Sequence, residues 1–345
     1  MRPTFRMLLS ALAFSTAFIP ALSEAIPFPQ PRINDECQFI RDKIDSLSKS
    51  GGVVKIPAGT YTCKAPIIIA RDNVMLKGAE RTKTILRLAD YIHVPLLVVG
   101  HPHTIVREGT LVTPWRVKNI VVKDMTFDGN RAKHYVSREC GETHCDGDVT
   151  SIRNNAISIR GASHVTIQDV TAHSSISGGL VTEKFCDNLK IINFESHSNF
   201  FDGFAGYETE NSEFINVNLH NNRGAGVSID IRFNNNVFKG GQLYMNNDVG
   251  IFARDLHGNR FEDLKIINSG SFGVFLASTF AGKPELCARD NTFSGVKIIG
   301  SGKQAIRVND LCAGNRIENK SFFRGNLGCV SDDGQTSVAA DTQCD

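Results

Sequence analysis

The sequence lacks the features that mark several common protein classes. Its 345 residues carry a formal net charge of only +2 and no basic block, so we expect no nucleic-acid partner. No stretch beyond the first 25 residues is apolar enough to cross a bilayer. The leucine framework of leucine-rich repeats is missing, and the cysteines lack zinc-ligand spacing. We therefore predict no metal site of that kind.

No linker or charge block divides the chain, so we predict one domain over residues 26–345. The first 25 residues are typical of a secretory signal peptide. Arg2 and Arg6 precede an apolar stretch, and Ser-Glu-Ala at 23–25 offers a cleavage site. A membrane anchor is the alternative, but the stretch is short and Pro20 interrupts it. We expect a secreted or periplasmic protein with no membrane attachment after cleavage.

Nine cysteines in an oxidising compartment predict disulfides. Cys287 and Cys312 stand about one repeat apart, which would place them on adjacent coils. The other expected pairs are Cys37–Cys63, Cys140–Cys145 and Cys329–Cys344. Cys186 remains as a buried thiol.

A motif of one small residue followed by alternating apolar residues recurs every 23 or 24 residues, with one interval of 32. Its small residues are Ala156, Gly179, Gly203, Gly226, Gly250, Gly273 and Ala305. Such a period is typical of a solenoid, whose coils pack only against their neighbours. Because the coils contain short strands and no helical segment, we predict an all-β fold, a right-handed parallel β-helix.

Other segments fit this fold. Residues 35–49 predict an amphipathic capping helix with Asn34 as its N-cap, ending near Gly51. Residues 131–154 do not follow the repeat and predict a long loop. Residues 330–345 predict a polar tail that wraps or frays. The corner residues are expected to stack, with asparagine side chains forming hydrogen-bond ladders. They are His164, Asn188, Asn211, Asn235, Asn259, Asn291 and Asn315.

The repeat predicts which strand residues face outward, because side chains alternate along a strand. Counting from each small residue, positions one and three are mostly apolar and should face the core. Positions two and four should face out. Position four reads Arg160, Glu183, Tyr207, Asp230 and Arg254 over five coils, so these residues should form one line. Phe252 is an outward aromatic residue at position two.

Two chemistries suit that line. Glu183 and Asp230 lie two coils apart, which is compatible with the carboxyl separation of inverting glycosidases. Alternatively, Tyr207 serves as acid or base, with its pKa lowered by neighbouring arginines. Arg160 and Arg254 would then bind substrate carboxylates, which favours an acidic sugar. A solvated face of compensating charges is the structural alternative.

The chain resembles the catalytic module of bacterial secreted mannuronan C-5 epimerases over roughly residues 35–250. The most specific shared segment is DMTFDGNR at 124–131. Weaker ones are GGVVKIPAGTY at 51–61, DNVMLKGAERTKTILRL at 72–88, SGGL at 177–180, DGF at 202–204 and NNR at 221–223. The resemblance implies a parallel β-helix of the pectate-lyase-like superfamily and an active face at position four.

The family's catalytic Asp-Pro-His motif is absent. Val181 replaces its Asp, Glu183 replaces its His, and a further catalytic Asp falls at Tyr207. The candidates for the family's basic residue are Arg223, Lys133 and Arg138. Calcium binding occurs in the family, but no ligand set transfers to this chain. We therefore predict no cofactor and leave calcium open.

Together these observations predict a secreted, monomeric protein that acts on a polysaccharide. A lyase or C-5 epimerase of uronate polymers is the first hypothesis, with Tyr207, Glu183 and Asp230 as catalytic residues. Substrate would be bound by Arg160, Arg254, Arg223 and Phe252. A glycoside hydrolase using Glu183 and Asp230 is the second hypothesis. A non-catalytic glycan-binding or small-molecule protein is the third.

Overall fold

The computed structural model describes residues 34–102, 105–107, 110–113, 116–134, 152–280, 282–333 and 335–345. The chain divides into two units, residues 1–33 and 34–345, and all described residues belong to the second. The predicted signal peptide, most of the 131–154 loop and the Cys140–Cys145 pair lie outside the described residues. No helix among the described residues is long and apolar enough to span a bilayer.

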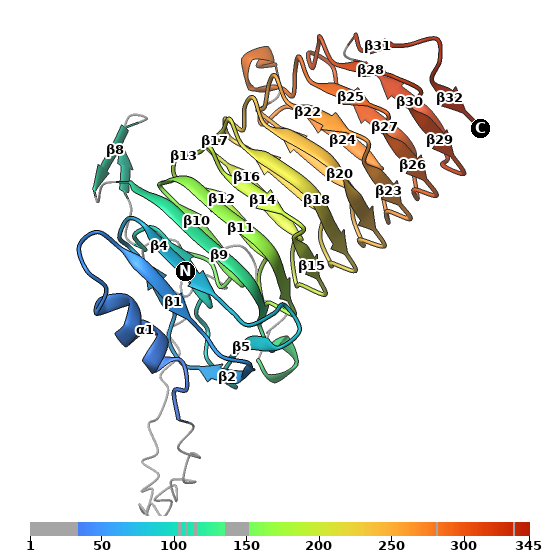
Figure 1. Ribbon diagram of the computed structural model, residues 1–345. Helices are drawn as coiled ribbons and strands as arrows, with labels where there is room; N and C mark the ends of the chain where they lie inside the picture. The colour runs from blue at the N-terminus through green and yellow to red at the C-terminus, as the bar shows by residue number, and fades with distance from the viewer. Residues whose placement is uncertain are drawn as a thin grey trace, which may run out of the picture. The chain divides into compact units, whose positions relative to one another are not determined.

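Residues 34–345 form a stack of coils, with colour running steadily along the stack from the first coil to the last (Figure 1). One strand of most coils joins a ten-stranded parallel sheet. Its members are β3 (Ile67–Ile69), β6 (Leu97–Val99), β10 (Ile157–Arg160), β12 (Leu180–Glu183), β16 (Phe204–Tyr207), β19 (Val227–Asp230), β21 (Ile251–Arg254), β24 (Val274–Ala277), β27 (Gln304–Val308) and β30 (Gly328–Asp332). The right-handed parallel β-helix prediction is confirmed.

A twenty-stranded sheet forms the rest of the coil walls. Its strands are β1 (Gly52–Lys55), β2 (Gly59–Cys63), β4 (Val74–Lys77), β5 (Thr84–Leu88), β9 (Val117–Asp128), β11 (Ala162–His173), β13 (Cys186–Asp187), β14 (Lys190–Ile192), β15 (Glu195–His197), β17 (Thr209–Glu210), β18 (Glu213–His220), β20 (Val237–Tyr244), β22 (Arg260–Glu262), β23 (Lys265–Ile267), β25 (Thr292–Ser294), β26 (Lys297–Ile299), β28 (Arg316–Glu318), β29 (Phe322–Arg324), β31 (Ser337–Val338) and β32 (Gln343–Cys344). Strands β7 (Ile105–Arg107) and β8 (Thr110–Thr113) form a separate antiparallel pair.

The capping helix α1 (Gln38–Asp45) is shorter than the predicted 35–49. The backbone N–H of Cys37 donates to the Asp35 carboxylate at 3.2 Å, so the chain turns at Asp35 and the helix begins later. Asn34 is therefore not the N-cap, which is Cys37. α1 packs against β1 and β3 at the first coil (Figure 1).

The predicted inward positions are confirmed. Every position-one and position-three residue from β10 to β27 is buried. The small-residue column has a steric cause, because a Cβ at Gly179 would lie 1.9 Å from Ser196 Oγ and one at Gly250 2.4 Å from Ile266 Cγ2. The coil wall leaves no room for a larger side chain at those glycines.

The coil corners use left-handed backbone conformations, which asparagine, aspartate and glycine tolerate best. One corner column has φ between 51° and 64° on successive coils: Asp124, Asp169, Asn193, Asn216, Gly240 and Asp263. The left-handed turns thus explain why Asn and Gly recur between the strands of the repeat.

The predicted asparagine ladder exists, but it is displaced by one residue on some coils. Asn259 Nδ2 donates to Asn291 Oδ1, and Asn291 Nδ2 to Asn315 Oδ1, both at 3.0 Å. On the preceding coil the buried ladder residue is Asn236, while the predicted Asn235 is an exposed left-handed corner residue. Asn235 forms the left-handed corner and Asn236 forms the ladder. The sequence alone does not show which of the two adjacent asparagines has which role.

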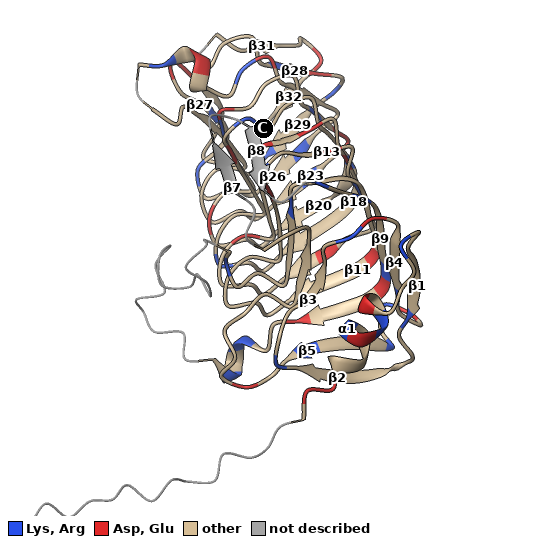
Figure 2. Ribbon diagram, turned by 90° about the vertical axis from the view of Figure 1, so that its left-hand side faces the viewer, with Lys and Arg blue, Asp and Glu red and all other residues tan. Residues whose placement is uncertain are grey.

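The prediction that residues 330–345 form a tail that wraps or frays is wrong. β30, β31 and β32 pair in parallel with β27, β28 and β29, so residues 328–344 form a final coil. Disulfides Cys37–Cys63, Cys287–Cys312 and Cys329–Cys344 are present as predicted, and Cys186 is a buried free thiol. Basic and acidic residues are interspersed along the coils (Figure 2).

Candidate functional site

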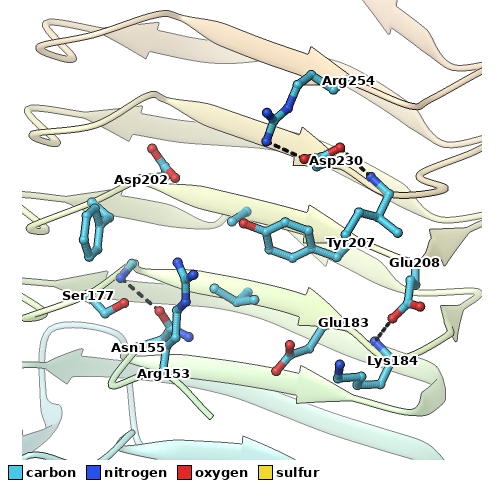
Figure 3. A pocket seen from close by; sticks show the side chains of 15 residues that line it. Arg153, Asn155, Ser177, Glu183, Lys184, Asp202, Tyr207, Glu208, Asp230 and Arg254 are labelled. Atoms are coloured by element: carbon cyan, nitrogen blue, oxygen red, sulfur yellow. Dashed lines mark hydrogen bonds and ion pairs between the residues drawn. The ribbon is translucent and has the colours of Figure 1, made fainter. Parts of the chain in front are cut away.

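A groove of about 420 Å³ lies on the outer face of the ten-stranded sheet, over β12, β16, β19 and β21. Most of its lining is polar, and Figure 3 shows these side chains along adjacent coils. The lining residues are Arg153, Asn155, Ser177, Gly178, Val181, Glu183, Lys184, Phe201, Asp202, Ala205, Tyr207, Glu208, Asp230, Ile231 and Arg254. The small position-two residues Val181 and Ala205 form part of its floor.

Four of the five position-four residues meet in this groove: Glu183, Tyr207, Asp230 and Arg254. Tyr207 pairs in register with Asp230, and Thr182 with Gly206, so the column is continuous from coil to coil. In Figure 3 the Tyr207 ring lies between Glu183 and Asp230. The stacked repeat therefore brings together residues that are far apart in sequence.

Arg160 corrects the prediction of an accessible five-residue line. Its side chain is fully buried, and its Nη1 donates to the carbonyl oxygen of Pro102 at 2.5 Å. The segment around Pro102 covers this end of the column. Arg160 Nε lies 3.0 Å from Glu183 Oε1, so it acts on the groove only through Glu183. It cannot bind a substrate carboxylate directly.

Asp230 is held on both of its oxygens. Its Oδ1 accepts the backbone N–H of Ile231 at 2.9 Å and the hydroxyl of Thr279 at 2.7 Å. Its Oδ2 pairs with the Arg254 guanidinium. These donors and the cation all favour the charged carboxylate.

Glu183 has the opposite surroundings. Its side chain is only 17% exposed, and burial raises the pKa of its carboxyl above the ordinary value. Arg160, Lys184 and Arg153 lower this pKa without cancelling the effect of burial, and Glu208 adds to the rise. The groove thus combines a carboxyl group whose pKa is raised by burial with a carboxylate that contacts Arg254, Thr279 and the Ile231 N–H.

Tyr207 corrects a second prediction. Burial, followed by the charge of Asp202, raises the pKa of Tyr207 to about 12, where the sequence predicted a lowered value. The expected arginines do not act on it, since Arg160 is buried beside Glu183 and Arg254 faces Asp230. The phenol therefore stays protonated at neutral pH and can donate a hydrogen bond.

The remaining predicted substrate-binding residues lie outside the groove lining. The Arg223 guanidinium stacks over the Phe200 ring at 4.6 Å. Phe252 is half-buried, with Arg254 over one side at 5.0 Å and Phe275 at 5.5 Å. Neither residue lines the groove, although Phe252 contacts Arg254, the ion-pair partner of Asp230.

Several lining residues were not predicted. Lys184 and Glu208 follow position four directly, while Asn155, Gly178 and Asp202 precede the small residue of their coils. Extending the repeat by one position in each direction would have identified these five residues. Arg153 precedes the first regular coil, and no signal in the repeat points to it.

The lining contains slightly more negative than positive charge. Its carboxylates are Glu183, Asp202, Glu208 and Asp230, and its cations are Arg153, Lys184 and Arg254. Among the described residues, no group of three or more His, Cys, Asp or Glu side chains is arranged to hold a metal ion.

Comparison with known proteins agrees with the fold. A family model described as "Right handed beta helix region" matches residues 155–342. No curated protein sequence matches the chain. The structure of Geobacillus virus E2 ORF18 is similar with a TM-score of 0.68 and 15% identity, over 89% of this chain and 57% of that one. This chain therefore spans little more than half the length of the viral protein.

Two similar structures contain carbohydrate-acting modules. The Azotobacter vinelandii mannuronan C-5 epimerase AlgE4 A-module has a TM-score of 0.56 at 16% identity, over 89% of this chain and 96% of the module. The catalytic domain of a GH87 α-1,3-glucanase, crystallised with tetrasaccharides, has a TM-score of 0.54 at 12% identity, over 92% of this chain and 59% of that domain. At these identities the similarity establishes the fold alone.

Proposed function

The chain belongs to the right-handed β-helix family, and on this scaffold we propose that it hydrolyses a polysaccharide between Glu183 and Asp230. The observation that carries the proposal is the contrast between these two carboxyl groups. Burial raises the pKa of Glu183, whereas Arg254, Thr279 and the Ile231 N–H stabilise the Asp230 carboxylate. Such a pair assigns the acid and the base of a glycosidase.

The spacing of the coils supports the same chemistry. Glu183 and Asp230 lie two coils apart, which separates their backbones by roughly 9–10 Å. Inverting glycosidases hold their carboxyl groups about 6.5–9.5 Å apart, leaving room for a water molecule beside the sugar. Glu183 would protonate the leaving glycosidic oxygen, while Asp230 would accept a proton from the attacking water. Tyr207, between them, would donate a hydrogen bond to a sugar oxygen.

The charges of the groove favour a neutral or weakly charged glycan. With Glu183 protonated as the acid, the lining has as many carboxylates as cations, and Arg254 is paired with Asp230. A lining without excess positive charge gives a polyuronate no net attraction. The three disulfides suit an oxidising compartment, so we further propose that the protein acts after secretion.

A uronate lyase or C-5 epimerase is the second candidate. Tyr207 is central in the groove, and Arg153 and Lys184 line it as well. The similar Azotobacter module belongs to a mannuronan C-5 epimerase. This candidate is weaker, because Arg160 is sequestered and the pKa of Tyr207 is raised to about 12, which makes it a poor base.

A panel of polymers separates the candidates. The protein is incubated with neutral glucans and xylan, and with alginate and pectate. New reducing ends without unsaturated products, released in the inverted anomeric form by NMR, are the expected result. Ultraviolet absorbance of unsaturated uronates would instead identify a lyase, and a changed uronate ratio without cleavage an epimerase. No change and no binding with any polymer would reject an enzymatic role for the groove.

A further inference from the structure

The one long interval of the repeat builds a separate structural element. The spacing of 32 residues between Gly273 and Ala305 exceeds the usual 23 or 24, and the extra residues follow β24. They form an arm, residues 278–287, of which the structure describes all but 281. The arm folds back on itself through the antiparallel bridge Ser278–Cys287, and the Thr279 N–H donates to the Leu286 carbonyl oxygen at 3.1 Å.

The base of the arm is fixed to the body of the β-helix. Cys287 forms a disulfide with Cys312 on the following coil, and both are buried. Directly after the arm, the Ala288 N–H donates to the Ala277 carbonyl oxygen at 3.1 Å. Ser278 Oγ also donates to the Phe280 carbonyl oxygen at 2.7 Å within the turn. The arm is therefore a braced element with its own internal contacts.

The arm reaches one groove residue. Thr279 Oγ1 donates to Asp230 Oδ1 at 2.7 Å, across 49 residues of sequence and two coils of the sheet. Oδ1 also accepts the Ile231 N–H, and Oδ2 faces Arg254, so the plane of the carboxylate is fixed. Oδ1 already accepts two hydrogen bonds, whereas Oδ2 has the single partner Arg254, so Oδ2 is the oxygen with an acceptor position left for a water molecule.

We propose that the inserted arm is a positioning device for the reaction, in which Thr279 orients the Asp230 carboxylate and the Cys287–Cys312 disulfide holds Thr279 in place. The proposal rests on the hydrolytic function proposed for the groove. Thr279 acts through Asp230 and is a positioning residue. A mere structural role for the arm would not couple the disulfide to Thr279 and Asp230.

The kinetic test compares Thr279→Val, which keeps the shape and removes the hydroxyl, with Thr279→Ser, which keeps the hydroxyl. Loss of a hydrogen bond to a charged group is expected to lower kcat on the order of ten-fold in the valine variant. The KM of this variant should change little, because Thr279 is not part of the groove lining. The serine variant should keep both properties close to wild type.

The disulfide is tested by a double-mutant cycle with Cys287→Ala and Cys312→Ala together. Since both sulfurs are buried, substitution is preferable to a reductant. Removing the disulfide should lower kcat in wild type but change it little in the Thr279→Val background, because the hydroxyl it positions is already missing. Equal losses in both backgrounds, or an unchanged kcat in Thr279→Val, would overturn the proposal.

Amide hydrogen exchange gives a readout that needs no catalytic activity. Exchange of the arm amides should become faster in Thr279→Val and in Asp230→Ala, and should stay at the wild-type rate in Thr279→Ser. Unchanged exchange in the first two variants overturns the arm proposal even if the enzyme is active. If instead wild type cleaves no polymer while the exchange pattern is as expected, the hydrolytic function fails and the Thr279–Asp230 anchor stands.

Discussion

The Arg160 guanidinium lies behind the Glu183 carboxylate, with its Nε 3.0 Å from Glu183 Oε1, and is itself shielded from solvent. Glu183 is therefore the one residue of this pair that lines the groove. Burial raises the pKa of Glu183 while Arg160 lowers it, so the two effects together set the protonation of the proposed acid. Arg160, which the repeat predicted to bind substrate, instead lowers the pKa of the neighbouring Glu183 carboxyl group.

Substitution of Arg160 should affect stability. Arg160→Met removes one partner of a buried pair, so we expect a loss of about 3 kcal/mol in the free energy of unfolding, measured in urea. The pKa of Glu183 should rise further, because the nearest cation is gone. Arg223→Met, at an exposed arginine outside the groove, serves as the control and should change stability by less than about 0.5 kcal/mol. Equal stability of both variants would contradict the buried pairing.

The proposed acid, Glu183, should control the alkaline limb of the pH profile. Glu183→Gln removes the proposed proton donor and should lower kcat about 10²–10⁴-fold with little change in KM. In wild type, activity should fall on the alkaline side as Glu183 loses its proton, at a pH above that of an ordinary glutamate. Asp230→Asn removes the proposed base and should lose most of the rate. An alkaline limb that persists in residual Glu183→Gln activity would assign the acid elsewhere.

Tyr207→Phe distinguishes the two candidate reactions. For hydrolysis the phenol only donates a hydrogen bond, so the variant should lose about ten-fold in kcat/KM. As the acid or base of a lyase it would lose far more. Because burial raises the pKa of Tyr207 to about 12, its ionisation should leave no mark on rates measured up to pH 10. Kinetics on the best polymer of the panel, with Glu183→Gln in parallel, measure the difference.

A second ladder of buried asparagines, formed by Asn199, Asn222 and Asn246, should contribute to stability in proportion to burial. Asn246 Oδ1 accepts from Asn222 Nδ2 at 3.0 Å, and Asn246 Nδ2 donates to the Leu219 carbonyl oxygen at 3.0 Å. Asn246→Ala leaves these groups without partners, so about 2 kcal/mol or more of unfolding free energy should be lost. The adjacent Asn247 is exposed, and Asn247→Ala should be close to neutral. Similar losses in both variants would argue against a ladder.

A column of stacked rings predicts a pH-dependent stability. His197 lies 4.9 Å from the rings of both His173 and His220, with the carboxylates of Glu195 and Asp128 nearby. Burial, then repulsion from the two histidines, lowers the pKa of His197 from 6.5 to about 4. As the pH falls, His197 is therefore protonated in the unfolded chain at a higher pH than in the folded chain.

The contribution of His197 is complete above pH 6.5 and is lost as the pH falls from 6.5 toward 4. His197→Gln removes that loss, so its melting temperature should decline less than that of wild type between pH 7 and pH 5. Thermal unfolding at the two pH values measures this. A variant with the same decline as wild type would show that His197 does not titrate differently in the folded chain.

The sequence by itself determined the coil, its period and the direction of each strand side chain. These follow from local rules: alternation along a strand, small residues where coil walls meet, and Asn, Asp or Gly at left-handed corners. In a solenoid each coil contacts mainly its neighbours, so local rules extend along the stack. Glu183, Tyr207, Asp230 and Arg254 were therefore predicted to share one face, and they do.

The tertiary structure decided which outward residues are open to solvent and what their surroundings do to them. Arg160 satisfies the repeat yet is covered by Pro102, and Tyr207 acquires a raised pKa from burial and from Asp202. Thr279 contacts Asp230 from an inserted segment, which appears in the sequence only as one longer interval of the repeat. The burial of a side chain and the electrostatic potential at it depend on every segment nearby, including segments outside the repeat. Neither can therefore be predicted from one column of repeat positions.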